Sequence, residues 1–154
     1  MELTEIFIIL KKNKYSESDL ILQALSSNGS KKSFIAKGAL KSKKRFGGGI
    51  LEPTHYVKLT YKPAQSDGGL NYLNEASLID DFRGIRLDYD KIEFALTMMN
   101  CAYHVSQEGE IESHFLFNLL GHALRYLNNC NSQDLSYFKL HFYLKFLFQQ
   151  GVIS

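Results

Sequence analysis

Short runs of alternating hydrophobic and polar residues fill the first half of the chain, which is the pattern of β-strands. Five such runs are bounded by turn residues such as Asn28-Gly29. They cover residues 3–10, 19–25, 32–36, 55–61 and 70–78. Five short strands in so compact a stretch favour a small closed sheet over alternating strands and helices.

The second half of the chain changes to a hydrophobic spacing of 3.6 residues, which is typical of helices. Residues 90–105 form the first predicted helix, with Asp90 and Glu93 as a capping pair, and a second helix follows from Phe115 to Leu127. A third is predicted over residues 133–150, ended by Gly151. Apolar side chains cover nearly every side of this third helix, so we expect neighbouring helices or a partner to bury it.

The composition places the chain among folded proteins, because 45% of its residues are hydrophobic and 22% are charged. No run of about 18 apolar residues exists to span a membrane. The first residues lack the features of a secretory signal, so we expect a cytoplasmic protein. The two patterns together predict an α+β fold with domains at residues 1–80 and 81–154.

The net charge of +2 hides a division between the two halves of the chain. Residues 1–62 hold twelve basic and five acidic residues, a net charge of +7, whereas residues 63–154 hold six basic and eleven acidic ones, a net charge of −5. A basic half next to an acidic half indicates a polyanionic partner for the basic one.

Most of this positive charge lies in one segment that contains no acidic residue. Its members are Lys31, Lys32, Lys37, Lys41, Lys43, Lys44 and Arg45. Positive charge follows a phosphate backbone and an aromatic ring stacks on a base, so the segment and the adjoining Phe46 are candidates for nucleic-acid binding. A solvated Lys-rich loop is the alternative, and a buried role for Phe46 stays open. Phe34 lies in an alternating strand and is predicted to be core.

A series of short motifs runs through and around this segment: Glu17-Ser18-Asp19-Leu20-Ile21-Leu22, Gly29, Ala36-Lys37-Gly38-Ala39, Lys41-Ser42-Lys43, Arg45-Phe46-Gly47-Gly48 and Leu51-Glu52-Pro53. In their order and spacing these motifs resemble the bacterial DNA repair family RecO. A weaker match continues through Glu75-Ala76-Ser77-Leu78 and Phe82-Arg83-Gly84-Ile85-Arg86. The order and spacing of these motifs are specific, and the strong ones cover about a quarter of the chain.

The resemblance implies a five-stranded OB-fold barrel followed by an α-helical domain. It also implies a recombination mediator that is not an enzyme and needs no cofactor. Such proteins bind single- and double-stranded DNA, anneal strands, and assist RecA loading together with RecR and single-strand-binding protein. By position, Lys37, Lys41, Lys43 and Arg45 match the family's basic residues. Lys31, Lys32 and Lys44 join the DNA-binding set on charge alone.

This sequence departs from the family pattern in one respect. Typical members of the family continue further along the chain, and many carry a zinc-binding cysteine cluster there. This chain has only Cys101 and Cys130, without a CxxC pair, so we expect no zinc site. The uncovered side of the third helix would then face a second copy of the chain or another protein. We expect the acidic tail of single-strand-binding protein to dock near Lys139 and Lys145, unless these two form only the helix's polar stripe.

Other candidate sites have simpler explanations. The histidines are expected to be ordinary surface or boundary residues rather than metal ligands. The acidic pairs Asp80-Asp81 and Asp88/Asp90 lie next to a helix start, where carboxylates act as caps. No set of residues combines a nucleophile with a base, so an enzyme is not predicted. The rival to a DNA-binding mediator is a short interaction module that bridges repair partners with little DNA binding.

Overall fold

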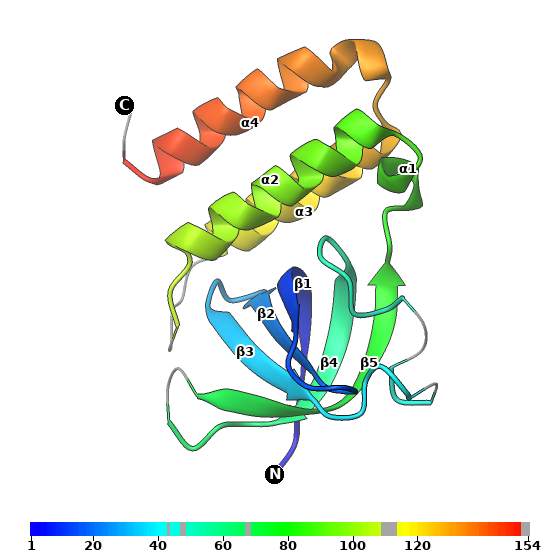
Figure 1. Ribbon diagram of the computed structural model, residues 1–154. Coiled ribbons are helices and arrows are strands. Elements are labelled where there is room, and N and C mark those ends of the chain that lie inside the picture. The colour runs from blue at the N-terminus through cyan, green and yellow to red at the C-terminus, as the bar shows by residue number, and fades with distance from the viewer. Residues whose placement is uncertain (43, 47–48, 67–68, 109–113, 152–154) are drawn as a thin grey trace.

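The computed structural model describes residues 1–42, 44–46, 49–66, 69–108 and 114–151, and it begins with a closed barrel (Figure 1). The strands are β1 (Leu3–Lys14), β2 (Leu20–Ser26), β3 (Lys31–Ala36), β4 (Tyr56–Lys62) and β5 (Leu70–Asp80). They follow the order β1-β2-β3-β5-β4 around the barrel, and only β3 and β5 among these described neighbours run parallel. The predicted closed five-stranded barrel within an α+β fold is confirmed.

The inside of the barrel is filled by the apolar residues that alternate along the strands. Phe34 is fully buried, and its ring centre lies 5.1 Å from that of Phe7 and 5.1 Å from that of Tyr61, edge to face in both cases. This geometry is the favoured one for aromatic pairs. Leu22 and Leu59 are equally inaccessible. The core prediction for Phe34 is therefore confirmed.

The helices form two further layers. They are α1 (Arg83–Arg86), α2 (Tyr89–Val105), α3 (Phe115–Asn129), the 3-10 turn η1 (Ser132–Asp134) and α4 (Leu135–Gln149). α2 and α3 lie against the barrel, and α4 lies on their far side (Figure 1). Among the described residues, no helix combines the length and apolar character that crossing a membrane requires. The short helix α1 was not predicted.

The start of α2 differs from the sequence prediction. Asp88 is the N-cap, and its side chain accepts hydrogen bonds from the backbone N–H groups of Asp90 (2.9 Å) and Lys91 (3.3 Å). The hydroxyl of Ser132 also donates to Asp88, which lowers the pKa of that carboxyl. The predicted pair of Asp90 and Glu93 is thus wrong by two residues. At the end of α4, Gly151 adopts a φ of 76°, as a helix-ending glycine does.

One face of the barrel shares a hydrophobic core with the helices. The outward side chains Ile8 and Leu10 of β1, together with Leu25 of β2, pack in the same cluster as the buried faces of α2, α3 and α4. The inward side chains Phe7 and Ile9 belong to the separate cluster inside the barrel. β1 therefore serves two cores with its two faces.

Two separated sequence motifs meet at the join between barrel and helices. The guanidinium of Arg86 donates to the Thr54 hydroxyl (3.1 Å) and to the carbonyl oxygen of Pro53 (3.1 Å). At Gly84, an added Cβ would overlap the carbonyl and side-chain oxygens of Asn128, so only glycine allows α1 to approach the end of α3 this closely. This explains why a glycine and an arginine stand there.

Candidate functional site

The basic segment after β3 is a loop held against the β1–β2 connection. The backbone N–H of Gly38, which has a φ of 69°, donates to the Asp19 carboxylate (2.8 Å). This bond lowers the pKa of the Asp19 carboxyl. The N–H of Leu40 donates to the carbonyl oxygen of Ser18 (3.0 Å). A glycine in the left-handed region thus lets the chain turn onto an aspartate acceptor.

The loop presents three lysines to solvent. Lys37, Lys41 and Lys44 are exposed, and none of the three forms an ion pair within the part of the chain that the structure describes. Lys43 lies outside the described residues. Exposed and unneutralised ammonium groups on a short loop produce a local positive potential that attracts polyanions.

Arg45 makes contacts within the loop as well as facing solvent. Its guanidinium donates to the carbonyl oxygen of Lys37 (2.6 Å) and lies 4.9 Å from the ring centre of Phe46. It therefore ties the two ends of the loop together. Its remaining donors are still able to reach a phosphate, because the side chain is only partly buried.

Phe46 is buried, whereas a base-stacking residue must expose its ring. Its side chain is 3% exposed and packs with Leu51 in the core cluster inside the barrel. Burial of this apolar ring in the cluster removes it from water and so stabilises the fold. The stacking role predicted for Phe46 is therefore withdrawn in favour of the buried role that was left open.

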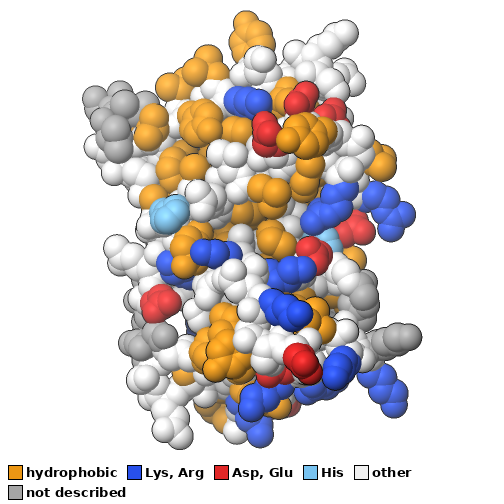
Figure 2. Space-filling view, viewed as in Figure 1, with side chains coloured by type: hydrophobic (Ala, Val, Ile, Leu, Met, Phe, Trp, Pro, Cys, Tyr) orange, Lys and Arg blue, Asp and Glu red, His pale blue; other side chains and the backbone are white. Residues whose placement is uncertain are grey.

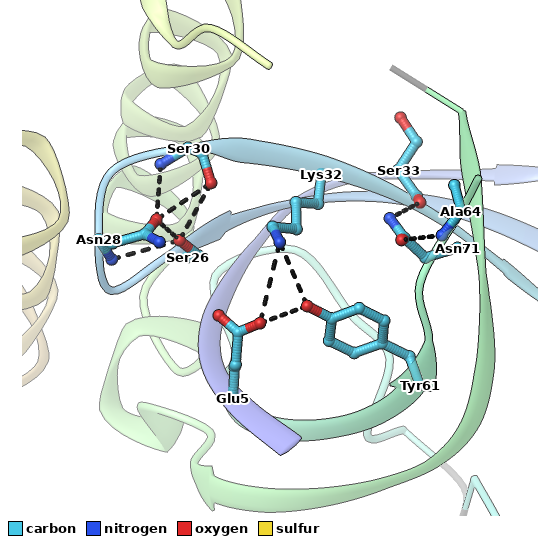
Figure 3. Close-up of polar contacts among 9 residues, drawn as sticks. All are labelled: Glu5, Ser26, Asn28, Ser30, Lys32, Ser33, Tyr61, Ala64 and Asn71. Atoms are coloured by element: carbon cyan, nitrogen blue, oxygen red, sulfur yellow. Dashed lines mark hydrogen bonds and ion pairs between the residues drawn. The ribbon is translucent and has the colours of Figure 1, made fainter. Parts of the chain in front are cut away.

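Lys31 and Lys32 are likewise engaged within the protein. Lys31 Nζ donates to the carbonyl oxygen of Tyr103 (2.9 Å) and lies 4.3 Å from the centre of the Tyr103 ring, so it links β3 to α2. Lys32 points into the barrel mouth, where its Nζ donates to the Tyr61 hydroxyl (3.2 Å) and lies 3.8 Å from Glu5 (Figure 3). Both lysines therefore have side-chain partners within the protein, whereas the ammonium groups of Lys37, Lys41 and Lys44 have none among the described residues.

The network around Lys32 closes one end of the barrel. The Tyr61 hydroxyl donates to Glu5, and burial together with this bond raises the pKa of Tyr61 well above its ordinary value. Nearby, the Asn71 side chain donates to the Ser33 carbonyl oxygen (2.9 Å) and accepts from the Ala64 N–H (2.8 Å), as Figure 3 shows. These polar groups satisfy one another, so they explain Lys32 without a ligand.

A groove lies between α3 and α4, with a volume of about 1020 Å³. Its lining is mostly apolar and includes Phe115, Tyr126, Tyr137 and Phe148, which are all at least half exposed. The basic side chains among its described lining residues are His122, His141 and Lys145, and none of those described residues carries a carboxylate. Figure 2 shows hydrophobic side chains across the helical half of the visible face, whereas Lys and Arg gather mainly over the barrel.

Lys139 and Lys145 do not share this groove, although they lie on one helix. Lys145 lines it, whereas Lys139 Nζ lies 5.5 Å from the ring centre of Phe94 on α2. The offset of six residues turns the two side chains toward different neighbours. Within the described ranges, no three His, Cys, Asp or Glu side chains gather as a metal site would need.

Comparison with known proteins matches residues 1–82 to the family described as Recombination protein O N terminal. The chain is 34% identical to the DNA repair protein RecO of Maridesulfovibrio salexigens, over 98% of its own length and 59% of that protein. It is 38% identical to RecO of Syntrophus aciditrophicus over 76% of the chain and 44% of that relative. It is 30% identical to RecO of Bacillus pumilus, over 85% and 49% respectively. The chain thus spans between 44% and 59% of the length of these curated relatives.

Proposed function

Because this chain belongs to the RecO family of DNA repair proteins, we propose that it is a DNA-binding recombination mediator without a reaction of its own. In this role it binds single- and double-stranded DNA, anneals complementary strands, and assists RecA loading with RecR and single-strand-binding protein. The observation that carries the proposal is the loop from Lys37 to Arg45, with its exposed lysines Lys37, Lys41 and Lys44.

The chemistry of this loop suits phosphate contacts rather than base recognition. Ammonium groups on flexible side chains act as point charges toward phosphate oxygens, and such contacts carry no sequence information. Neutralising the phosphates of two strands reduces their mutual repulsion, so complementary strands approach and pair. Annealing then needs no bond-making by the protein.

Salt dependence of binding tests this proposal. If Lys37, Lys41, Lys44 and, from the sequence alone, Lys43 each contact one phosphate of a single strand, log K should fall against log salt with a slope of about −3. Fluorescence anisotropy of a labelled oligonucleotide, titrated at several salt concentrations, measures the slope. An affinity that does not change with salt, or no binding at low salt, would contradict the proposal and favour the interaction-module alternative.

We further propose that the groove between α3 and α4 receives the acidic, apolar-ended tail of single-strand-binding protein. Three observations support this assignment: the apolar lining, the cationic Lys145, and the absence of a carboxylate among the lining residues that the structure describes. An apolar terminal segment would fill the aromatic lining, while its carboxylates would face Lys145 and the two histidines. The same groove would also serve the interaction-module alternative.

A labelled acidic tail peptide provides the test of the groove. We expect Lys145→Glu to weaken peptide binding about tenfold, because it places a carboxylate where the peptide brings its own. Lys139→Glu is the matched control, since it makes the same charge change on the same helix outside the groove lining. Equal losses in both variants would indicate a general charge effect, and unchanged binding in both would remove the groove from the proposal.

A further inference from the structure

An exposed aromatic side chain lies on the outer face of the barrel, beside the basic loop. Tyr72 is 37% exposed, and β5 places it between β3 and β4. In the sheet register it is opposite Ile35 of β3 on one side and opposite Lys62 of β4 on the other. Its chain neighbours Asn71 and Leu73 are buried. Since strand side chains alternate between faces, Tyr72 points outward.

The apolar surface continues from Tyr72 across two more strands. Ile35 is opposite Ile21 of β2, so Ile21, Ile35 and Tyr72 form one row on the outer face. Both isoleucines are partly exposed, whereas Phe34 and Ala36, on either side of Ile35, are buried. Neighbouring strands lie about 4.8 Å apart, so the row across three strands is roughly 10 Å long. We call Ile21, Ile35 and Tyr72 the outer strip.

Positive charge adjoins the outer strip at two places. Lys62 follows Tyr72 in the same row and is exposed, and Lys37 comes two residues after Ile35 along β3 into the basic loop. Within the described residues, neither lysine forms an ion pair. An apolar strip beside unneutralised cations is the combination by which proteins hold single-stranded nucleic acid, through stacking and phosphate contacts together.

We propose that Tyr72 is a base-stacking residue, and that the outer strip holds the bases of a single strand while Lys62 and Lys37 hold its phosphates. This inference rests on the proposed DNA-binding function and adds to it the residue that replaces Phe46 as the stacking aromatic. Bases in a duplex already stack on one another, so Tyr72 contributes to the binding of single strands and not of duplexes.

The first test compares substitutions at Tyr72 on two kinds of strand. Tyr72→Ala should weaken binding of a single-stranded oligonucleotide about tenfold, while Tyr72→Phe, which keeps the ring, should stay within about twofold. On an abasic strand of equal length, the two variants and the parent should bind alike, because no base is present to stack. The salt slope should be unchanged in all three, since no phosphate contact is lost.

Fluorescence supplies a second and direct test. The chain contains no tryptophan, so Tyr72→Trp introduces a single reporter at the outer strip. Its emission should be quenched by a single strand with bases and not by the abasic strand. The matched control is Tyr89→Trp, at the 76% exposed start of α2, whose emission should not change in either titration.

The possible failures are separable. If the parent chain binds no single strand at low salt, the proposed function fails and this inference fails with it. If the parent binds with the expected salt slope but Tyr72→Ala binds equally well, only the inference fails. A loss on the abasic strand as great as on the normal one would show that Tyr72→Ala had damaged the fold, and the quenching experiment with Tyr72→Trp would then decide alone. Unquenched emission at saturation overturns the stacking role.

Discussion

Charge reversal of Lys37, Lys41 and Lys44 together is expected to weaken single-stranded DNA binding by about 100-fold or more at about 50 mM salt. Three attractive contacts become repulsive, and no carboxylate among the described residues is left without a partner by the change. All sequences should be affected alike, because phosphate contacts carry no sequence information. Anisotropy titrations with several unrelated oligonucleotides measure both effects.

The control for this experiment is a lysine outside the loop. Lys58 is exposed on β4, opposite Ile6 of β1 rather than beside the basic segment. Lys58→Glu should therefore cost much less affinity than Lys41→Glu. Similar losses from the two single reversals would mean that DNA responds to the overall field of the barrel rather than to this loop.

Removing the aromatic centre of the barrel should have the largest effect on stability. Phe34→Ala is expected to lower the free energy of unfolding by about 4 kcal/mol, because it deletes a fully buried ring and leaves a cavity beside Phe7 and Tyr61. Urea titration followed by circular dichroism measures the change. Phe34→Leu should lose less, since it fills more of the same space.

The same experiment separates a core role from a ligand-binding role. Tyr15→Ala changes a residue that is 64% exposed, so it should alter stability by less than about 0.5 kcal/mol. Phe34→Leu should still bind DNA like the parent. A variant at Phe34 that stayed stable but lost DNA affinity would contradict the core assignment.

The strands were predictable because one periodicity governs them. Lys32, Phe34 and Ala36 share a face of β3, and the structure directs all three inward. The alternation alone therefore indicates that Lys32 points into the barrel. Counting positive charges along the segment does not take this alternation into account, so it grouped Lys32 with the exposed lysines. The same alternation places Tyr72 outward, between Asn71 and Leu73, and so held the signal for the outer strip.

Other features depend on contacts between distant parts of the chain. Phe46 is buried because it packs with Leu51 in the cluster inside the barrel, and no local hydrophobic period around Phe46 indicates such a contact. The ammonium group of Lys31 donates to the carbonyl oxygen of Tyr103, a residue more than seventy positions later in the sequence. The uncovered aromatic surface of α4 was expected from its composition, but the groove arises only where α4 meets α3. The division into domains at residue 80 stays a prediction.

The double use of β1 has a practical consequence for dissecting the molecule. A fragment containing only residues 1–82 would keep the basic loop and the outer strip, yet it would expose Ile8, Leu10 and Leu25 to water. Such a fragment would tend to self-associate through that bare sheet face, and its apparent DNA affinity would reflect clustered copies. The barrel should therefore be studied with its helices attached, since they cover that face.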